Sequence, residues 1–80
     1  MKITIGIPAY NEENNIAQII MKLKKISDSI IVCDDGSSDM TSEISKELDV
    51  TLVKHEKNQG YGAAIKTIFQ KAREIGSDIL

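Results

Sequence analysis

Short apolar runs alternate with amphipathic segments along the chain. The run 30–33 (IIVC) is continuously apolar, and because strand side chains point alternately to opposite faces, this strand is expected to be buried on both faces. β-branched residues predict two further strands at 3–7 and 50–53, the first ending at Pro8, which lacks an amide donor for sheet pairing. The last segment, 77–80, is expected to begin a fourth strand.

The first of three predicted helices follows the first strand. Asn11 is expected to be its N-cap, with Glu12 and Glu13 in its first turn, where the helix dipole favours acidic side chains. The helical pattern continues to about Ile26. The apolar residues expected to face the core are Ile16, Ile19, Ile20 and Leu23.

Two more helices are expected after the second and third strands. Ser38 or Asp39 is expected to cap the second, and the third is expected to begin near Tyr61 and to end at Gly76. Their core-facing residues are predicted to be Met40, Ile44 and Leu48 in the second helix, and Ile65, Ile68, Phe69, Ala72 and Ile75 in the third.

Strands that alternate with helices predict an α/β fold, a Rossmann-like three-layer sandwich with a parallel sheet. Because crossover connections are right-handed, we expect the order third, second, first, with the fourth strand beside the first. The sequence stops as that fourth strand begins. We therefore expect residues 1–80 to form a single partial domain, the N-terminal portion of something larger.

Composition narrows the function classes. The net charge of −2 and the lack of a basic stripe argue against nucleic-acid binding. The single cysteine, Cys33, lies inside the apolar run and is interpreted as a small buried hydrophobe rather than a nucleophile. No segment approaches the roughly 20 apolar residues of a membrane span, so a cytoplasmic location is expected for this chain.

Polar residues follow the apolar run directly, at what is expected to be the carboxyl end of a central strand. Ligands of open α/β sheets bind at this edge, beside the helix N-termini, which places Asp34 and Asp35 for recognition. Adjacent residues of a strand point to opposite faces, so the two carboxylates are not expected to share one substrate atom.

Three motifs occur in order over nearly the whole chain: IPAYNEE at 7–13, VCDDGSSD at 32–39 and NQGYGAA at 58–64. Together they resemble the family 2 glycosyltransferases of GT-A fold. The most similar branch is that of the dolichol-phosphate mannosyltransferase-like and polyprenyl-phosphate glycosyltransferase-like enzymes.

The resemblance implies that the first two strand ends bind the nucleotide of a nucleotide sugar. Residues at the positions of Pro8, Tyr10 and Glu12 border the base and ribose in such enzymes, and an acid matching Asp35 or its neighbour Asp34 hydrogen-bonds the base. The chemistry agrees, because a carboxylate accepts strongly from a ring N–H and a tyrosine offers a π-face to a planar base. Simpler alternatives are that Glu12 is only a helix-end acid and Tyr10 only a surface ring.

The third motif is not the dinucleotide fingerprint of dehydrogenases, because Ile65 fills the third glycine position. Instead, Gly60 and Gly62 are expected to let the loop pass close to the diphosphate or sugar. Lys66 lies about one turn into the helix, within reach of a phosphate, although a solvated lysine is the simpler interpretation. His55 has no acid or thiol at ligand spacing and is expected to be a solvated loop residue.

The resemblance also implies Mg²⁺ or Mn²⁺, held by an Asp-x-Asp motif after the fourth strand, which lies beyond residue 80. We therefore expect no catalytic residue, metal ligand or cofactor site within this chain. The expected role is the nucleotide-binding part of an enzyme that moves a sugar from a nucleoside-diphosphate sugar to a lipid phosphate or glycan acceptor, with a full-length parent that is membrane-associated. The alternative is an inactive nucleotide-binding module or excised fragment. A truncated sheet edge also favours homodimer formation.

Overall fold

The computed structural model describes residues 3–76 and 78–79, in which strands and helices alternate. None of the helices in this part of the chain is long and apolar enough to cross a membrane. The elements in order are β1 (Ile3–Ala9), α1 (Ile16–Leu23), β2 (Ile30–Asp34), α2 (Thr41–Glu47), β3 (Thr51–Lys54), α3 (Tyr61–Glu74) and β4 (Asp78–Ile79).

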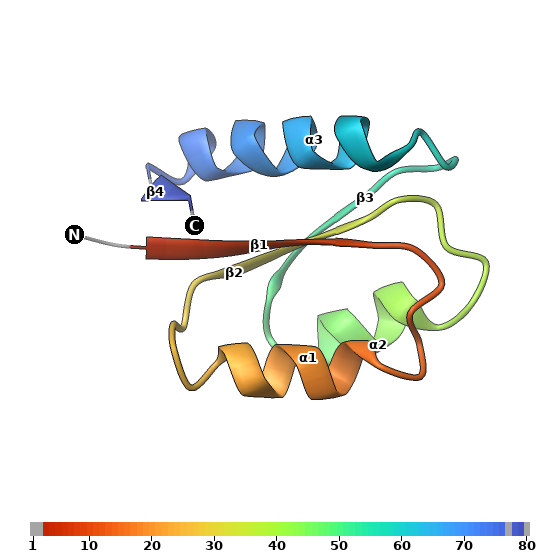
Figure 1. The fold of residues 1–80 in the computed structure, drawn as a ribbon, viewed down its shortest axis with the longest axis horizontal. Coiled ribbons are helices and arrows are strands. Elements are labelled where there is room, and N and C mark those ends of the chain that lie inside the picture. The colour runs from red at the N-terminus through yellow and green to blue at the C-terminus, as the bar shows by residue number, and fades with distance from the viewer. Residues whose placement is uncertain (1–2, 77, 80) are drawn as a thin grey trace.

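The strands form one parallel sheet in the order β3-β2-β1-β4 (Figure 1), which confirms the predicted order and direction. β1 pairs with β2 in a register that places Ile7 opposite Val32. β4 pairs with β1 at Ile3 and Thr4. In the described residues β1 has no neighbour on this side beyond Thr4, and self-association through this edge stays a prediction. The predicted strand residues 77 and 80 lie outside the described residues.

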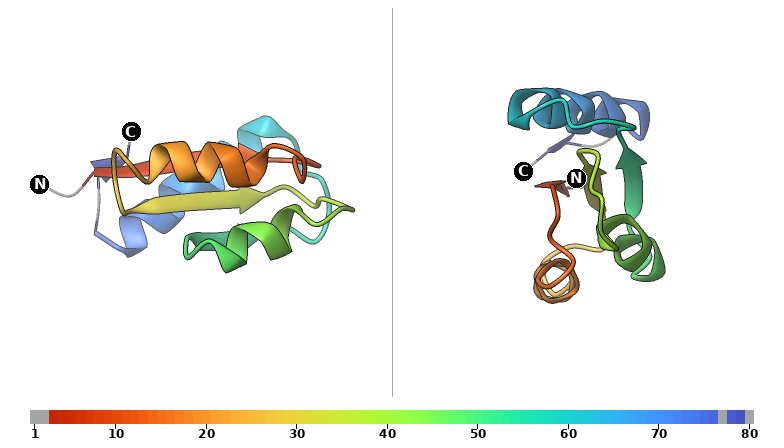
Figure 2. Two further views of the ribbon diagram at one scale, coloured as in Figure 1. Left: turned by 90° about the horizontal axis from the view of Figure 1, so that it is seen from below. Right: turned by 90° about the vertical axis from the view of Figure 1, so that its right-hand side faces the viewer.

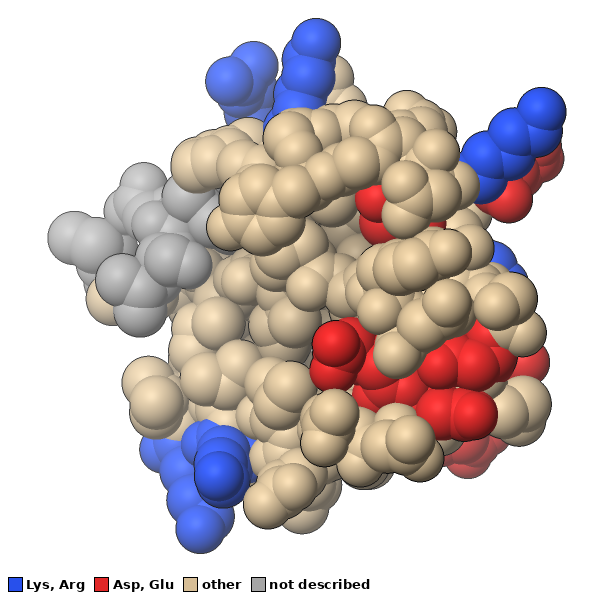
Figure 3. All heavy atoms as spheres, turned by 45° about the vertical axis from the view of Figure 1, so that its right-hand side comes forward, with Lys and Arg blue, Asp and Glu red and all other residues tan. Residues whose placement is uncertain are grey.

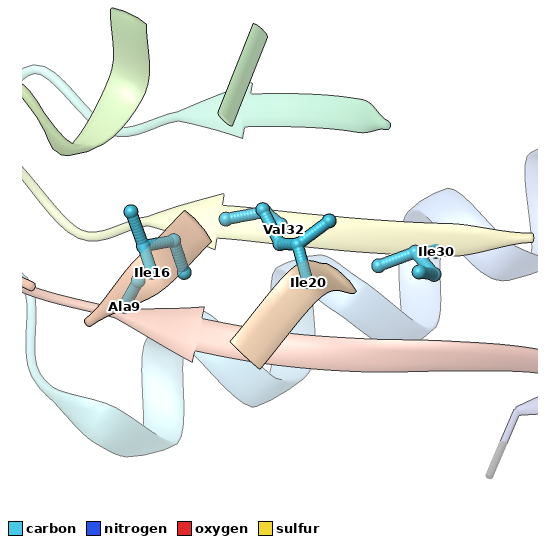
Figure 4. Packing of buried hydrophobic residues seen from close by; sticks show 5 residues of the cluster. All are labelled: Ala9, Ile16, Ile20, Ile30 and Val32. Carbon is cyan, nitrogen blue, oxygen red and sulfur yellow. The ribbon is translucent and has the colours of Figure 1, made fainter. Parts of the chain in front are cut away.

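Helices cover both faces of the sheet, as predicted for a three-layer sandwich. α3 lies on one face, and α1 and α2 lie on the other (Figure 2). Every residue of β2 is buried, because this central strand has helices on both sides. Figure 4 shows Ile16 and Ile20 of α1 against the sheet residues Ala9, Ile30 and Val32. The opposite face packs Ile31, Cys33, Ala64, Ile68 and Ala72, which confirms the burial of Cys33.

The predicted start of the first helix is wrong. α1 begins at Ile16, with Asn15 as its N-cap, and has no acidic residue in its first turn. Asn11 adopts a positive φ of 51° in the preceding loop, where its side chain bonds to the loop after β2. The helix also ends earlier than predicted, at Leu23, and is followed by a turn.

Three residues predicted to face the core are exposed: Ile19, Met40 and Phe69. The fully buried residues of α3 lie on one line, Ala64, Ile68 and Ala72, spaced four residues apart, and Ile65 and Ile75 pack beside them while partly exposed. Phe69 follows Ile68 and is therefore turned by about 100° from that line. Met40 lies before the first residue of α2 and does not share the helix face.

Candidate functional site

A pocket of about 280 Å³ lies at the carboxyl ends of β1 and β2. Its lining combines the end of β1, the end of β2 and the start of α3. A larger hollow of about 370 Å³ lies at the amino ends of β2 and β3, but ligands of open α/β sheets bind at the carboxyl ends. The smaller pocket is therefore the candidate site. It is lined by Pro8, Ala9, Tyr10, Asp35, Asn58, Gly60, Tyr61 and Ala64.

The structure brings together four of the residues that the sequence singled out, namely Pro8, Tyr10, Asp35 and Gly60. Tyr10 is 49% exposed and Tyr61 is 73% exposed, so two largely accessible aromatic residues border the pocket. Tyr61 was not among the predicted site residues, although it lies inside the third motif. Aromatic rings beside a carboxylate suit a planar heterocycle with a polar edge.

Asp35 is almost fully buried and accepts three hydrogen bonds from the protein. Oδ1 accepts from the Gln59 amide at 2.8 Å and pairs with His55 Nδ1 at 2.8 Å, and Oδ2 accepts from the Gly60 amide at 2.9 Å. The hydrogen bond from His55 and those from the Gln59 and Gly60 amides lower the pKa of Asp35, against the opposing effect of burial. A carboxylate has about four acceptor positions, so one on Oδ2 is left for a ligand donor.

Asp34 points to the other side of β2. Its side chain is fully buried and accepts hydrogen bonds from the Ser37 amide at 3.0 Å and from the Ser42 hydroxyl. These bonds hold the loop between β2 and α2. The sequence left the choice of base-binding acid open between Asp34 and Asp35, and of the two only Asp35 lines the pocket.

The loops that leave β1 and β2 are joined by hydrogen bonds. The Asn11 amide donates to Ser37 Oγ at 2.8 Å, and the Ser38 amide donates to Asn11 Oδ1 at 2.9 Å. The Glu12 amide donates to Thr41 Oγ1 at 2.9 Å. The Glu12 side chain does not line the pocket. These bonds fix the loop that carries Tyr10.

Asp39 strengthens the same junction. Its Oδ2 accepts from the Glu13 amide at 3.2 Å, and its Oδ1 accepts from the amide and hydroxyl of Thr41. Burial alone would raise the pKa of Asp39, but the hydrogen bonds from Thr41 and Glu13 outweigh it and lower the pKa. The prediction that Ser38 or Asp39 caps α2 is wrong, because the N-cap residue is Met40, and Asp39 instead accepts from Thr41, the first residue of the helix.

The loop after β3 closes the site from a third side. Gly36 has a positive φ of 76°, and its Cα faces the backbone of Lys57 and Asn58. Gly60 also has a positive φ, 96°, at the residue before α3. Gly62 and Lys66, predicted for the diphosphate or sugar, do not line the pocket, and the Lys66 side chain is exposed.

The prediction that His55 is a solvated loop residue is wrong. Its side chain is only 9% exposed and lies between Asp35 and Thr67 Oγ1, with 2.8 Å from Nε2 to the hydroxyl. No local pattern indicates this contact, because the two partners lie 20 residues before and 12 residues after the histidine.

The described residues do not fit a divalent cation. No group of three His, Cys, Asp or Glu side chains in ranges 3–76 and 78–79 is arranged to hold a metal. Figure 3 shows acidic side chains gathered on the side where the strands end, with Lys and Arg projecting at the margins. No lysine or arginine lines the candidate pocket.

The chain is similar to curated enzymes that act on lipid-linked phosphates. It is 41% identical to the UDP-N-acetylglucosamine–dolichyl-phosphate N-acetylglucosaminyltransferase of Methanococcus voltae, in an alignment that covers 91% of this chain and 36% of that protein. It is 31% identical to the dolichol-phosphate mannosyltransferase of Pyrococcus furiosus, covering 90% of this chain and 23% of that protein. The chain thus spans about a third or less of these relatives' lengths.

Among solved structures, the glucosyl-3-phosphoglycerate synthase of Mycobacterium tuberculosis superposes with a TM-score of 0.70 at 28% identity. The match covers 80% of this chain and 27% of that one, and that crystal contains Mn²⁺, uridine diphosphate and glucosyl-3-phosphoglycerate. The α/β architecture of this chain is therefore that of the GT-A glycosyltransferases. The sequence model "Glycosyl transferase family 2" matches residues 4–74, and the chain belongs to that family.

Proposed function

We propose that the pocket binds the nucleotide of a nucleoside-diphosphate sugar, and that this chain supplies the nucleotide-binding part of a glycosyltransferase whose acceptor is a lipid phosphate or glycan. The observation that carries the proposal is the convergence of Tyr10 and Asp35 in one pocket at the carboxyl ends of β1 and β2. The names of the similar enzymes, which include nucleotide-sugar donors and dolichyl-phosphate acceptors, support it.

Asp35 would select the base by its charge. An ionised carboxylate only accepts hydrogen bonds, so its remaining position on Oδ2 favours a base whose edge presents a ring N–H. Uracil and guanine have such a group, whereas cytosine and adenine present a ring nitrogen that is itself an acceptor. Tyr10 and Tyr61 would contact the faces of the base or ribose, and Pro8 would contribute apolar surface.

The diphosphate would lie toward the start of α3, where the backbone amides of the first helical turn, that of Gly62 among them, have no carbonyl partner within the helix. Lys66 lies about one helical turn further along α3, and its side chain is the cationic group of that helix nearest to Gly62 in the sequence. Without a lysine or arginine in the pocket lining, we expect nucleoside diphosphates to bind this chain only weakly, with a Kd of about 1 mM. We propose that Mg²⁺ or Mn²⁺ joins the diphosphate in the complete enzyme, held by residues other than those that the structure describes.

A binding module without catalysis is the second candidate, because the described residues contain no group suited to a metal ion. The two candidates agree on nucleotide binding and differ on transfer. Transfer of sugar by this chain alone, measured with UDP-sugars and dolichyl phosphate, would contradict the assignment of only the nucleotide-binding part to it.

The test of binding is an NMR titration of the 80-residue chain with UDP, GDP, CDP and ADP. We expect amide shifts at Tyr10, Asp35, Gly60 and Tyr61, with UDP or GDP binding more tightly than CDP or ADP. Asp35→Asn should weaken binding of the preferred nucleotide by about tenfold. Asp28→Asn, the same chemical change at an exposed site at the other end of the sheet, is the matched control. Shifts only at residues remote from the pocket would overturn the proposal.

A further inference from the structure

His55 connects the carboxylate at the pocket to the helix that covers the sheet. It immediately follows β3, and its Nδ1 lies 2.8 Å from Asp35 Oδ1. Its Nε2 lies 2.8 Å from the hydroxyl of Thr67 in α3. The ring is buried, so both contacts are shielded from water.

The Asp35 carboxylate fixes the direction of the hydrogen bond at Nδ1. An ionised carboxylate offers no proton, so Nδ1–H must donate to Asp35. In the neutral ring Nε2 is then an acceptor, and the Thr67 hydroxyl donates to it. The histidine therefore links Thr67 of α3 to the Asp35 carboxylate through two hydrogen bonds.

The cluster is not arranged as a nucleophilic site, although Cys33 Sγ lies 3.7 Å from His55 Nε2. The thiol is fully buried. Burial, followed by the nearby carboxylates of Asp35 and Asp34, raises the pKa of Cys33 to about 11. A thiol with so high a pKa forms very little thiolate near neutral pH, and thiolate is the nucleophilic form.

The other two donors to Asp35 come from the loop residues Gln59 and Gly60. The side chains of this loop are largely exposed, and Gln59 itself is exposed, whereas Thr67 belongs to a helix that packs on the sheet. Of the three donors, the imidazole is the only side chain, and its second bond reaches Thr67 within α3, whereas Gly60 bonds to the start of that helix through its carbonyl. The orientation of Asp35 thus depends on a bond from a buried ring as well as on the two loop amides.

We propose that His55 is a positioning residue for base recognition, which holds the Asp35 carboxylate so that the remaining acceptor position of Oδ2 faces the pocket. The inference rests on the proposed nucleotide binding. It extends the recognition site to a side chain that does not line the pocket, and to Thr67 behind it.

Two substitutions separate the two bonds of the ring. In His55→Asn the amide nitrogen takes a position similar to Nδ1 and can still donate to Asp35, but the contact with Thr67 is lost. In His55→Gln the amide reaches the position of Nε2, and the bond to Asp35 is lost. Both variants remove the same ring, so a general effect on packing is matched between them.

The measurement is the ratio of the Kd for CDP to the Kd for UDP, or of ADP to GDP if guanine is preferred, by NMR titration. We expect a ratio of about tenfold in the wild type, a value within about threefold of this in His55→Asn, and a ratio near one in His55→Gln. If the role of His55 were purely structural, its substitution would weaken the binding of both nucleotides equally and leave the ratio of their Kd values unchanged. Urea unfolding of each variant identifies those that fold. If His55→Gln does not fold, His55→Leu, which also lacks a donor to Asp35, should likewise bring the ratio near one.

The ¹⁵N chemical shifts of the His55 ring provide a test that needs no nucleotide. We expect a proton on Nδ1, and a ring whose only proton is on Nε2 would overturn the inference. Equal ratios in the wild type and in the variants that fold would also overturn it, while leaving the proposed function intact. If the wild type shows no nucleotide binding, the proposed function fails and the inference fails with it.

Discussion

Gly36 lies directly against Asn58, and a Cβ atom at position 36 would lie 2.5 Å from the Asn58 amide nitrogen and 2.5 Å from the Lys57 carbonyl carbon. Both neighbouring atoms are backbone, so neither moves aside as a side chain would. Gly36 also has a φ of 76°, which L-residues other than glycine rarely adopt. The loops after β2 and β3 can therefore approach each other only if residue 36 has no side chain.

We predict that Gly36→Ala destabilises the fold by more than about 1–2 kcal/mol, the cost of the left-handed backbone alone for an L-residue. The contact with residues 57–58 adds to this cost. Urea unfolding followed by circular dichroism measures the change.

Gly62→Ala is the matched control for this prediction. Nothing lies within 4 Å of a Cβ at Gly62, which is the second residue of α3. Because alanine is the better helix former, the substitution should stabilise the chain by roughly 0.5–1 kcal/mol. Equal effects of the two substitutions would contradict the packing described for the loops.

We next predict that acid destabilises the chain through Asp35 and Asp39. The folded-state pKa of each carboxyl lies below its ordinary value of 3.8. A lowered folded-state pKa contributes stability above the ordinary pKa, and this stability is lost as the pH falls through the folded-state pKa. The urea midpoint should therefore decrease below about pH 4.

Asp35→Asn and Asp39→Asn identify the source of this acid dependence. Each variant should be less stable than the wild type at pH 7, and the difference should shrink as the pH is lowered toward 2. A difference that is constant over this range would mean that the carboxylate charge does not contribute.

The architecture could be predicted because the signals for it are local. The continuous apolar run at 30–33 indicated a strand covered on both faces, and the handedness of crossover connections gave the strand order. The same reasoning placed Tyr10 and Asp35 together, since both follow neighbouring parallel strands. The pattern alone did not show which face carries the pocket, so it did not separate Asp35 from Asp34.

The errors arose where contacts between distant residues outweighed local preference. Asn11 has the chemistry of an N-cap, but its side chain bonds to Ser38, 27 residues away, and the helix begins later. His55 occurs in a polar tract typical of a surface loop. Its side chain is nevertheless buried, and it forms hydrogen bonds with Asp35 and Thr67. Such contacts depend on the assembled sheet and leave no periodic pattern in the sequence.

Cys33 should be unreactive in the folded chain. The thiol is fully buried, and its pKa is raised to about 11 by burial and by the carboxylates of Asp35 and Asp34. We expect a thiol reagent such as DTNB to react slowly at pH 8 without denaturant and rapidly in urea, because unfolding exposes the thiol and removes these effects. Equally fast reaction under both conditions would contradict the burial of Cys33.

The last prediction separates the role of Tyr10 as a wall of the pocket from that of an ordinary exposed aromatic ring. Tyr10 and Phe69 are each 49% exposed, but only Tyr10 lines the pocket. Tyr10→Leu should weaken UDP or GDP binding by about two- to tenfold, because a contact between aromatic faces contributes roughly 0.5–1.5 kcal/mol. Phe69→Leu should leave nucleotide affinity unchanged, and both substitutions should alter stability only slightly, since neither ring is buried in the core. NMR titration of both variants under identical conditions measures the affinities. Equal loss of affinity in the two variants would show that Tyr10 does not contact the nucleotide, and the base would then have to be placed against Tyr61 on the other border of the pocket.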